Sequence, residues 1–358
     1  MYSNVPRTEG YRKRLRRLIR FEYGIKSVSL EPARRGFYGE TWRLDSLEMP
    51  PEYLKDESAA AGAAGTAEAK GTAGAKGKAK KIRRSYFVKL DYSPHREIYE
   101  RSFAVADHLY NNGIDFISKI VKTTSGRLYA RFDGAILGVF EWIDGENAQT
   151  NETKIPEYRM LAKVYSVPCE GLQISREDFS SKCVDTFYTQ WSALKDEAVN
   201  SLLEKNRAKI EHRAGRLRVF SDLCRGDKTD FFITHGDAGG NFITSSEQDP
   251  VRYYIVDWDE PLLAPPERDA WVMCGHEWAR DAFHEALRQN GIEYTLRPER
   301  LAYYCYHYFF FYLTAYLDAL AQVGPEQLES YIKVIEEYID SWVQDSFDYV
   351  DMIRYTGT

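Results

Sequence analysis

The order of apolar and polar residues predicts strands in the first part of this chain and helices in the rest. Strands are predicted for four short alternating or apolar runs, at residues 25–30, 41–44, 85–90 and 135–145. Residues 94–112 have the apolar spacing of a helix that ends at Gly113. Helical spacing dominates from 155 to 223 and again from 271 to 358. The pattern predicts an α+β chain in which a sheet precedes a mostly helical region.

Two segments near the start differ from this pattern. Residues 55–84 contain a low-complexity Ala/Gly/Lys tract with almost nothing to bury, so we expect a flexible insertion between two strands of one sheet. Residues 11–23 form a basic amphipathic helix in which Leu15, Leu18 and Ile19 share a face. Such a helix can bind membranes or nucleic acid, but no accompanying motif supports either partner. We therefore expect it to pack on its own domain.

Composition indicates an ordered globular protein. The chain has 358 residues, of which 44% are hydrophobic, and no apolar run is long enough to cross a membrane. Five cysteines without a Cys-x-x-Cys pair favour a reducing cytoplasm over a disulfide framework. Residues 1–90 are basic and the remainder is acidic. This asymmetry suits a polyphosphate and a cationic acceptor, although ordinary solvated surface would explain it equally well.

The candidate chemistry lies in residues 231–259, where two short apolar runs each end in an acidic cluster. The first cluster is His235-Gly236-Asp237, with Asn241 four residues beyond Asp237. The second cluster contains Asp257 and Asp259. Phosphoryl transfer requires few protein groups: one Asp can orient and deprotonate an acceptor hydroxyl while an Asn and a second Asp hold Mg²⁺. Either cluster alone would be more typical of a turn, but together they favour a kinase-like site.

These motifs, HGD…N, IVDWD and PPERD, resemble the aminoglycoside phosphotransferase family, and VDWDEPLLAPPERD is most similar to the spectinomycin phosphotransferases. The resemblance implies a bilobal protein-kinase-like fold. An N-lobe at 1–140 would have a five-stranded antiparallel sheet packed on one helix, and a C-lobe at 141–358 would be mostly helical. It also implies an ATP- or GTP-dependent O-phosphotransferase with Mg²⁺ and an aminocyclitol acceptor. A housekeeping kinase for an amino alcohol, sugar or nucleoside, or a nucleotide-binding pseudokinase, are the alternatives.

The resemblance assigns roles in the central segment as well. Asp237 would be the catalytic base, and Asn241 and Asp257 would bind the metal. The family usually places the Asn five residues after the Asp, whereas here it is four residues after, and two glycines in the loop could compensate. His235 is expected to stabilise the loop by hydrogen bonds. Asp269 is expected to be the N-cap of a helix.

In the N-lobe, Gly36 and Gly39 lie in a turn whose backbone N–H groups could contact phosphates, or they could simply form a hairpin. Lys89 is a lone charge inside an apolar strand, so it needs an anionic partner. The family resemblance implies that Lys89 contacts the α- and β-phosphates and is held by a helix Glu. We choose Glu97 from helix geometry, although it could merely favour the helix N-terminus.

Two further groups could contact ligands. In the resembled family the connector after the sheet binds adenine, so Phe140 would guard the pocket while the Glu141 carbonyl and the Ile143 N–H contact the base. An ordinary edge strand is the alternative. The aromatic band at 303–312 is more typical of core than of an acceptor pocket. The acidic row Glu277, Asp281 and Glu285 could form an acidic wall for the acceptor or be a solvated helix face.

Overall fold

The computed structural model describes residues 8–33, 39–48, 81–92, 96–147, 150–227, 229–245, 250–320 and 323–354. The chain divides into two compact units. The sheet unit takes Tyr2–Phe103 and Ser118–Ile143, and the helical unit takes Ala104–Ile117 and Asp144–Thr358. The chain therefore changes unit three times, after Phe103, after Ile117 and after Ile143.

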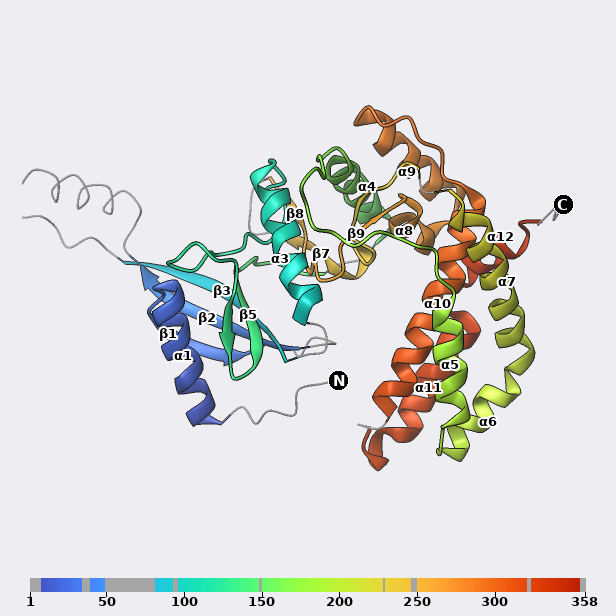
Figure 1. The fold of residues 1–358 in the computed structure, drawn as a ribbon, viewed down its shortest axis with the longest axis horizontal. Coiled ribbons are helices and arrows are strands. Elements are labelled where there is room, and N and C mark those ends of the chain that lie inside the picture. Colours follow the sequence, from blue (N-terminus) through green and yellow to red (C-terminus); the bar gives the residue numbers. More distant parts are fainter. Residues whose placement is uncertain are drawn as a thin grey trace, which may run out of the picture. The chain divides into compact units, whose positions relative to one another are not determined.

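The sheet unit contains the antiparallel five-stranded sheet that the sequence predicted, with strand order β1-β2-β3-β5-β4 (Figure 1). Its strands are β1 (Ser27–Pro32), β2 (Glu40–Glu48), β3 (Ile82–Asp91), β4 (Ala130–Phe132) and β5 (Ala135–Glu141). The central strand β3 pairs along its length with β2 and over its second half with β5. Backbone hydrogen bonds on both edges therefore fix the position of β3.

A helix packs on each face of this sheet, where one helix was predicted. The helix α1 (Glu9–Tyr23) buries Leu15 and Ile19 among the side chains of one face, with Leu18 partly buried beside them. This packing is the role expected for the basic helix. The helix α3 (Arg96–Asn111) begins on the other face, where Tyr99 and Phe103 form a small cluster with residues of β5 and the preceding loop.

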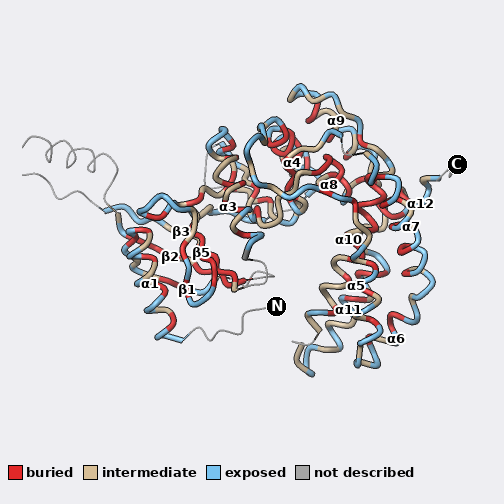
Figure 2. The backbone as a smooth tube through the Cα atoms, in the orientation of Figure 1, coloured by how far each residue is buried: buried red, intermediate tan, exposed pale blue. Residues whose placement is uncertain are grey.

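The helical unit is built around α10 (Pro298–Leu320), which packs against α5, α7 and α12. Most of the aromatic band lies buried in this helix (Figure 2), so the band is core, as the sequence favoured. The remaining helices of the unit are α4 (Asn151–Tyr165), α5 (Lys182–Ser192), α6 (Glu197–Lys205), α7 (Arg207–Arg225), α8 (Glu267–Ala270), α9 (Glu277–Gln289), α11 (Pro325–Ser341) and α12 (Gln344–Asp351).

Two short antiparallel pairs interrupt the helices and carry the candidate chemistry. The strand β6 (Phe232–Thr234) pairs with β9 (Leu262–Ala264), and β7 (Phe242–Ser245) pairs with β8 (Arg252–Ile255). The predicted acidic clusters follow directly after β6 and β8. Within the described part of the chain, no helix is both long and apolar enough to span a membrane.

Candidate active site

The loop from His235 to Asn241 carries the first acidic cluster and joins β6 to β7 through the 3₁₀ turn η1 (Gly239–Asn241). At its start Gly236 has a φ of +90°, a conformation that favours glycine. A Cβ at Gly236 would also lie 2.4 Å from the buried guanidinium of Arg268. Arg268 in turn contacts the Thr234 hydroxyl at 3.1 Å. Position 236 therefore requires glycine for two reasons: the positive φ of the turn and the close approach of Arg268.

Asp269 holds this loop from α8. Its carboxylate accepts hydrogen bonds from the backbone N–H groups of His235, at 3.1 Å, and of Gly236. It also accepts from the Tyr165 hydroxyl at 2.8 Å. The prediction that Asp269 is a helix N-cap is wrong, because Pro266 occupies that position and Asp269 lies inside α8. Because two of its partners are backbone N–H groups, no side-chain pattern in the sequence indicates this anchor.

His235 links the two acidic clusters. Its Nδ1 accepts from the Asp237 N–H at 3.1 Å, so the proton is on Nε2, which donates to the Val256 carbonyl at 2.9 Å. The ring also packs edge-on against Trp258, with centroids 4.7 Å apart. The histidine therefore stabilises the loop by hydrogen bonds, as expected. Its two ring nitrogens connect Val256, which precedes Asp257, to Asp237.

Asp237 and Asn241 lie side by side despite the short spacing between them. The turn at Gly239–Asn241 reverses the chain, and the Asn241 amide donates to the Asp237 backbone carbonyl at 2.9 Å and to its carboxylate at 3.2 Å. A Cβ at Gly240 would lie 2.7 Å from Asp237 Oδ1, so glycine lets the turn close against the carboxylate. The two adjacent glycines compensate for the missing residue in the loop.

The carboxylate of Asp257 lies near that of Asp237. Burial raises the pKa of Asp237, and the negative charge of Asp257 raises it further, against the lowering influence of His235, Gly240 and Asn241. Asp257 has a φ of +63°, a left-handed conformation that few non-glycine residues adopt. The segments after β6 and β8 thus bring two carboxylates close enough to interact, and the Asn241 side chain, just before β7, contacts the first of them.

This group of oxygen ligands suits Mg²⁺. Magnesium is commonly held by one or two carboxylates, with the phosphates of a substrate and water completing its shell. A divalent cation would also relieve the repulsion between Asp237 and Asp257 that raises the pKa of Asp237. Among the described residues, no cluster of three or more His, Cys, Asp or Glu could hold a metal by itself. Two carboxylates match an ion whose remaining ligands are substrate phosphates and water.

Lys89 is the predicted phosphate contact in the sheet unit. It is 6% exposed, and it pairs across the sheet with Thr41 on one side and Gly138 on the other. Its side chain points to the face on which α3 begins, and its Nζ lies 5.1 Å from the centre of the Tyr99 ring. The aromatic face favours a cation at this position. The lysine is held inside the sheet, not extended into solvent.

Glu97 does not have the predicted role. Its side chain is 83% exposed, and its carboxylate lies 3.7 Å from Arg101 on the same helix. The start of α3 is oriented by Tyr99 and Phe103, both of which are buried. Glu97 precedes Tyr99 by two residues and therefore lies about 160° away from it around the helix. An exposed carboxylate on the opposite side of the helix cannot hold a buried lysine.

The structure describes four of the five other predicted nucleotide contacts. Gly39 lies just before β2, and a Cβ there would be 2.3 Å from the Leu90 carbonyl, so the two strands approach too closely for any other residue. Gly36 lies outside the described residues. Phe140 is half-buried and packs edge-on against Phe103. The Glu141 carbonyl accepts from the Ser118 hydroxyl at 2.7 Å and has a second lone pair available. Ile143 is half-buried at the end of the sheet unit.

Comparison with known proteins identifies the family of this chain. The phosphotransferase enzyme family matches residues 77–304, well over half of the chain. The chain belongs to this phosphotransferase family. The predicted phosphotransferase class is therefore confirmed at the level of the family. No curated protein matches the chain.

Several solved structures share the fold of this phosphotransferase. A spectinomycin phosphotransferase in complex with ADP and spectinomycin is 21% identical, with a TM-score of 0.68 over 94% of this chain and 98% of that one. A microcompartment-associated aminopropanol kinase is 11% identical, with a TM-score of 0.59 over 95% and 99%. An ethanolamine kinase from Plasmodium vivax is 12% identical, with a TM-score of 0.56 over 96% and 92%. The predicted kinase-like fold is confirmed.

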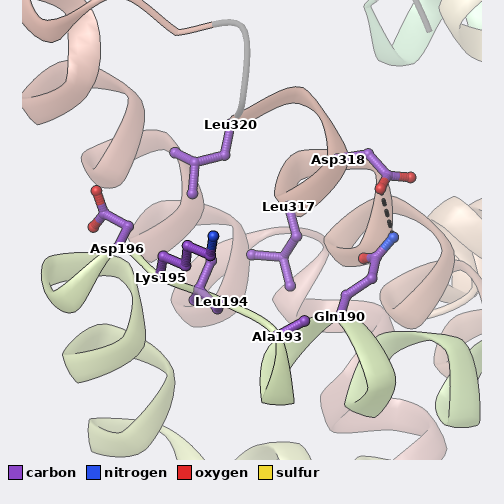
Figure 3. Close-up of a pocket in the computed structure, with 8 residues that line it drawn as sticks. All are labelled: Gln190, Ala193, Leu194, Lys195, Asp196, Leu317, Asp318 and Leu320. Carbon is purple, nitrogen blue, oxygen red and sulfur yellow. Dashed lines mark hydrogen bonds between the residues drawn. The ribbon is translucent and has the colours of Figure 1, made fainter.

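Two further features of the helical unit bear on the predicted acceptor contacts. The predicted acidic row on α9 is a solvated face, where Glu277 and Asp281 are exposed and Glu285 pairs with Arg288 at 2.7 Å. A cavity of about 530 Å³ lies beside the end of α10 (Figure 3). It contains none of the predicted site residues and is lined by Gln190, Ala193, Leu194, Lys195, Asp196, Leu317, Asp318 and Leu320.

Proposed function

We propose that this chain transfers the γ-phosphoryl group of ATP or GTP, with Mg²⁺, to a hydroxyl of a small cationic molecule, an aminocyclitol of the spectinomycin kind. The observation that carries the proposal is the grouping of Asp237, Asn241 and Asp257 at the ends of two short strands. Phosphoryl transfer depends on positioning and on charge stabilisation, and this grouping supplies both.

Each of these residues has one role in the proposed reaction. Asp237 accepts the hydrogen bond of the acceptor hydroxyl, orients that oxygen for attack, and takes its proton as the bond to phosphorus forms. Asn241 and Asp257 offer oxygen ligands to the metal. When bound, the metal neutralises the charge that develops on the phosphate oxygens. His235 and Asp269 do not touch the substrate but keep the loop in the required conformation.

Nucleotide binding uses groups of the sheet unit in this proposal. Lys89 donates to the α- and β-phosphates, and the backbone at Gly39, just before β2, contributes N–H groups to them. Phe140, the Glu141 carbonyl and the Ile143 N–H contact the adenine. The rigid pairing of β3 with its two neighbours supports the assignment of Lys89, because a phosphate-binding cation must be held in place. The aromatic ring of Tyr99 stabilises the positive charge of Lys89 by a cation–π contact that does not depend on the nucleotide.

The proposed acceptor is a cation because the chain beyond residue 90 carries an excess of acidic residues. The likeness to a spectinomycin phosphotransferase supports an aminocyclitol. The likeness to an aminopropanol kinase and an ethanolamine kinase makes an amino alcohol the second candidate. Resistance to an aminocyclitol antibiotic would follow from the first candidate, since phosphorylation changes the group that the antibiotic presents.

An acceptor screen tests the proposal directly. The purified protein is incubated with Mg²⁺ and either ATP or GTP, together with spectinomycin, other aminoglycosides, ethanolamine, aminopropanol, choline or simple sugars. We expect nucleoside diphosphate release that depends on spectinomycin, and a phosphate monoester visible by mass spectrometry and ³¹P NMR. Turnover with aminopropanol or ethanolamine instead would replace the aminocyclitol by the second candidate. Tight binding of Mg·ATP without turnover on any acceptor would indicate a pseudokinase.

The variant Asp237→Asn tests the assignment of the base. The exchange keeps the shape of the side chain but removes its ability to take a proton, so we expect kcat to fall by about 10³-fold or more. Binding of the nucleotide, measured by calorimetry, should remain within about threefold of the wild-type value. Asp281→Asn, the same exchange on the solvated face of α9, is the matched control. Substantial activity in Asp237→Asn would refute the role of Asp237.

A further inference from the structure

A buried ion pair lies in the first turns of α4. Lys154 Nζ donates to both carboxylate oxygens of Glu157, at 2.8 and 3.2 Å, and the two side chains are 9% and 3% exposed. Burial raises the pKa of the Glu157 carboxyl, while Lys154 opposes this shift. Both residues belong to the helical unit, which also contains the catalytic loop. Nothing in the function proposed above uses this pair.

The ammonium of this pair lies directly against the catalytic loop. A Cβ built on Gly239 would be 2.5 Å from Lys154 Nζ and 3.8 Å from a carboxylate oxygen of Glu157. Gly239 is the first residue of the turn that returns Asn241 to Asp237. The lysine therefore occupies the space that any side chain at position 239 would need, at the point where the loop changes direction.

Stability alone is a weak explanation for such a pair. Taking two charges out of water costs several kcal/mol per ion, and a buried pair commonly does no better than an apolar replacement. Both recorded hydrogen bonds of the Lys154 ammonium, within the described residues, go to Glu157. An ammonium has three N–H groups, so a donor remains beside the loop. Because Glu157 balances its charge, the lysine acts on the loop by its shape and contacts more than by its field.

We propose that Lys154 is a positioning residue for the phosphoryl transfer proposed above, and the inference rests on that function. Glu157 holds the ammonium, the ammonium sets the path of the backbone at Gly239, and this path sets the angle at which Asn241 meets Asp237. Asp269 anchors the start of the same loop, so the loop is fixed at two points. The inference extends the site to α4, an element that carries none of the predicted site residues.

A double-mutant cycle between positions 154 and 239 tests this contact. Gly239→Ala would push the ammonium away from the loop, and Lys154→Ala would remove it, so both variants disrupt the same arrangement. We expect each to lower kcat by about 10- to 100-fold, because a shift of about 1 Å in catalytic groups has effects of this size. The KM for the nucleotide should stay within about threefold. The double variant should be no worse than Lys154→Ala, since the added methyl then makes only an ordinary contact with Glu157, at 3.8 Å.

Matched controls separate the contact from general damage. Gly215→Ala places a methyl on α7 where nothing lies within 4 Å, and Lys205→Ala removes an exposed ion pair with Glu336. Both should leave kcat unchanged. If the losses in Gly239→Ala and Lys154→Ala multiply in the double variant, the two positions act independently and the inference fails. If Gly239→Ala does not fold, recovery of folding in the double variant supports the contact, and continued failure overturns it.

A second measurement keeps this inference separate from the proposed function. The same four proteins are unfolded in urea without substrate, and the coupling between the two positions is taken from their free energies of unfolding. Coupling at 154 and 239 in a protein that phosphorylates no acceptor would refute the function but not the contact. A wild type that phosphorylates its acceptor, together with additive effects in both assays, would refute the role of Lys154 and leave the function standing.

Discussion

Two aspartates, one in each unit, tie neighbouring segments together in different ways. Asp45 in β2 is buried and accepts hydrogen bonds from Ser29 in β1 at 2.7 Å, and from Ser85 and Arg83 in β3, each at 2.6 Å. Asp269 in α8 accepts from backbone N–H groups of the catalytic loop instead. The first joins strands that are already paired by their backbones. The second holds a loop that has few backbone hydrogen bonds of its own.

The comparison shows that similar contacts can serve different purposes. The ladder of β1, β2 and β3 would keep its register without Asp45, so this aspartate contributes mainly to the free energy of unfolding. The conformation at His235 and Gly236 depends on Asp269, so this aspartate contributes mainly to the geometry of the site. The two units should therefore respond oppositely to the same exchange of Asp for Asn.

The largest effect is expected for Asp269→Asn. The exchange weakens the anchor of the two loop N–H groups, so Asp237 loses its defined position and kcat should fall by about 100-fold. Nucleotide affinity should change little, because the exchange leaves the sheet unit untouched. Steady-state kinetics with the acceptor found in the screen measure both quantities. An unchanged kcat would mean that the loop holds its conformation without Asp269.

Lys89→Met tests function in the sheet unit without disturbing its backbone. Methionine keeps the length of the side chain, and β3 stays paired on both edges, so the loss should be confined to phosphate binding. A hydrogen bond to a charged group contributes about 1.5–3 kcal/mol, so the Kd for the nucleotide should rise by about 10- to 100-fold. Lys81→Met, at the exposed residue before β3, is the control. Equal nucleotide affinity in both variants would remove Lys89 from the site.

Asp45→Asn should affect stability and leave kcat almost unchanged. Burial alone would raise the pKa of Asp45, but hydrogen bonds from Ser85, Ser29 and Arg83 outweigh it and hold this pKa well below its ordinary value. A lowered pKa stabilises the folded state above the ordinary carboxyl pKa, and that contribution is lost as the pH falls below it. The variant should therefore be less stable by on the order of 2 kcal/mol at pH 7.

The difference between wild type and Asp45→Asn should shrink below about pH 4, because Asp45 of the unfolded wild-type chain takes up a proton there while the folded carboxylate stays ionised. Urea unfolding at several pH values, followed by circular dichroism, measures it. A difference that stays constant from pH 7 to pH 3.5 would show that the charge of Asp45 is not what stabilises the sheet.

Most of the fold could be predicted from the sequence because its elements are strongly periodic. The strand around Lys89 is a continuous apolar run with one charge, and the acidic clusters follow directly after the apolar runs of β6 and β8. The grouping of Asp237 with Asn241 and Asp257 could be predicted in outline for the same reason. The turn at Gly239–Asn241, which brings Asn241 back to Asp237 across only four residues, also follows from Gly239 and Gly240. Their close contacts exclude larger residues.

The roles of Glu97 and Asp269 could not be predicted, because they depend on tertiary packing that the helical spacing of apolar residues does not determine. The helix α3 starts in the sheet unit and continues in the helical unit, so Val105 and Leu109 do not define the face on which Tyr99 is buried. This change of packing partner is why Glu97 was misplaced. The role of Asp269 was missed because its partners are backbone N–H groups 33 and 34 residues away, which leave no side-chain pattern.

The left-handed backbone at Asp257 restricts how this position could change during evolution. Glycine and asparagine tolerate a φ of +63° with little strain, whereas branched residues do not. The codons for both are one nucleotide away from those for aspartate. Either substitution would remove the negative charge that the proposed site offers to a metal while leaving the local conformation intact. A descendant could therefore lose turnover in a single genetic step and still persist as a folded protein.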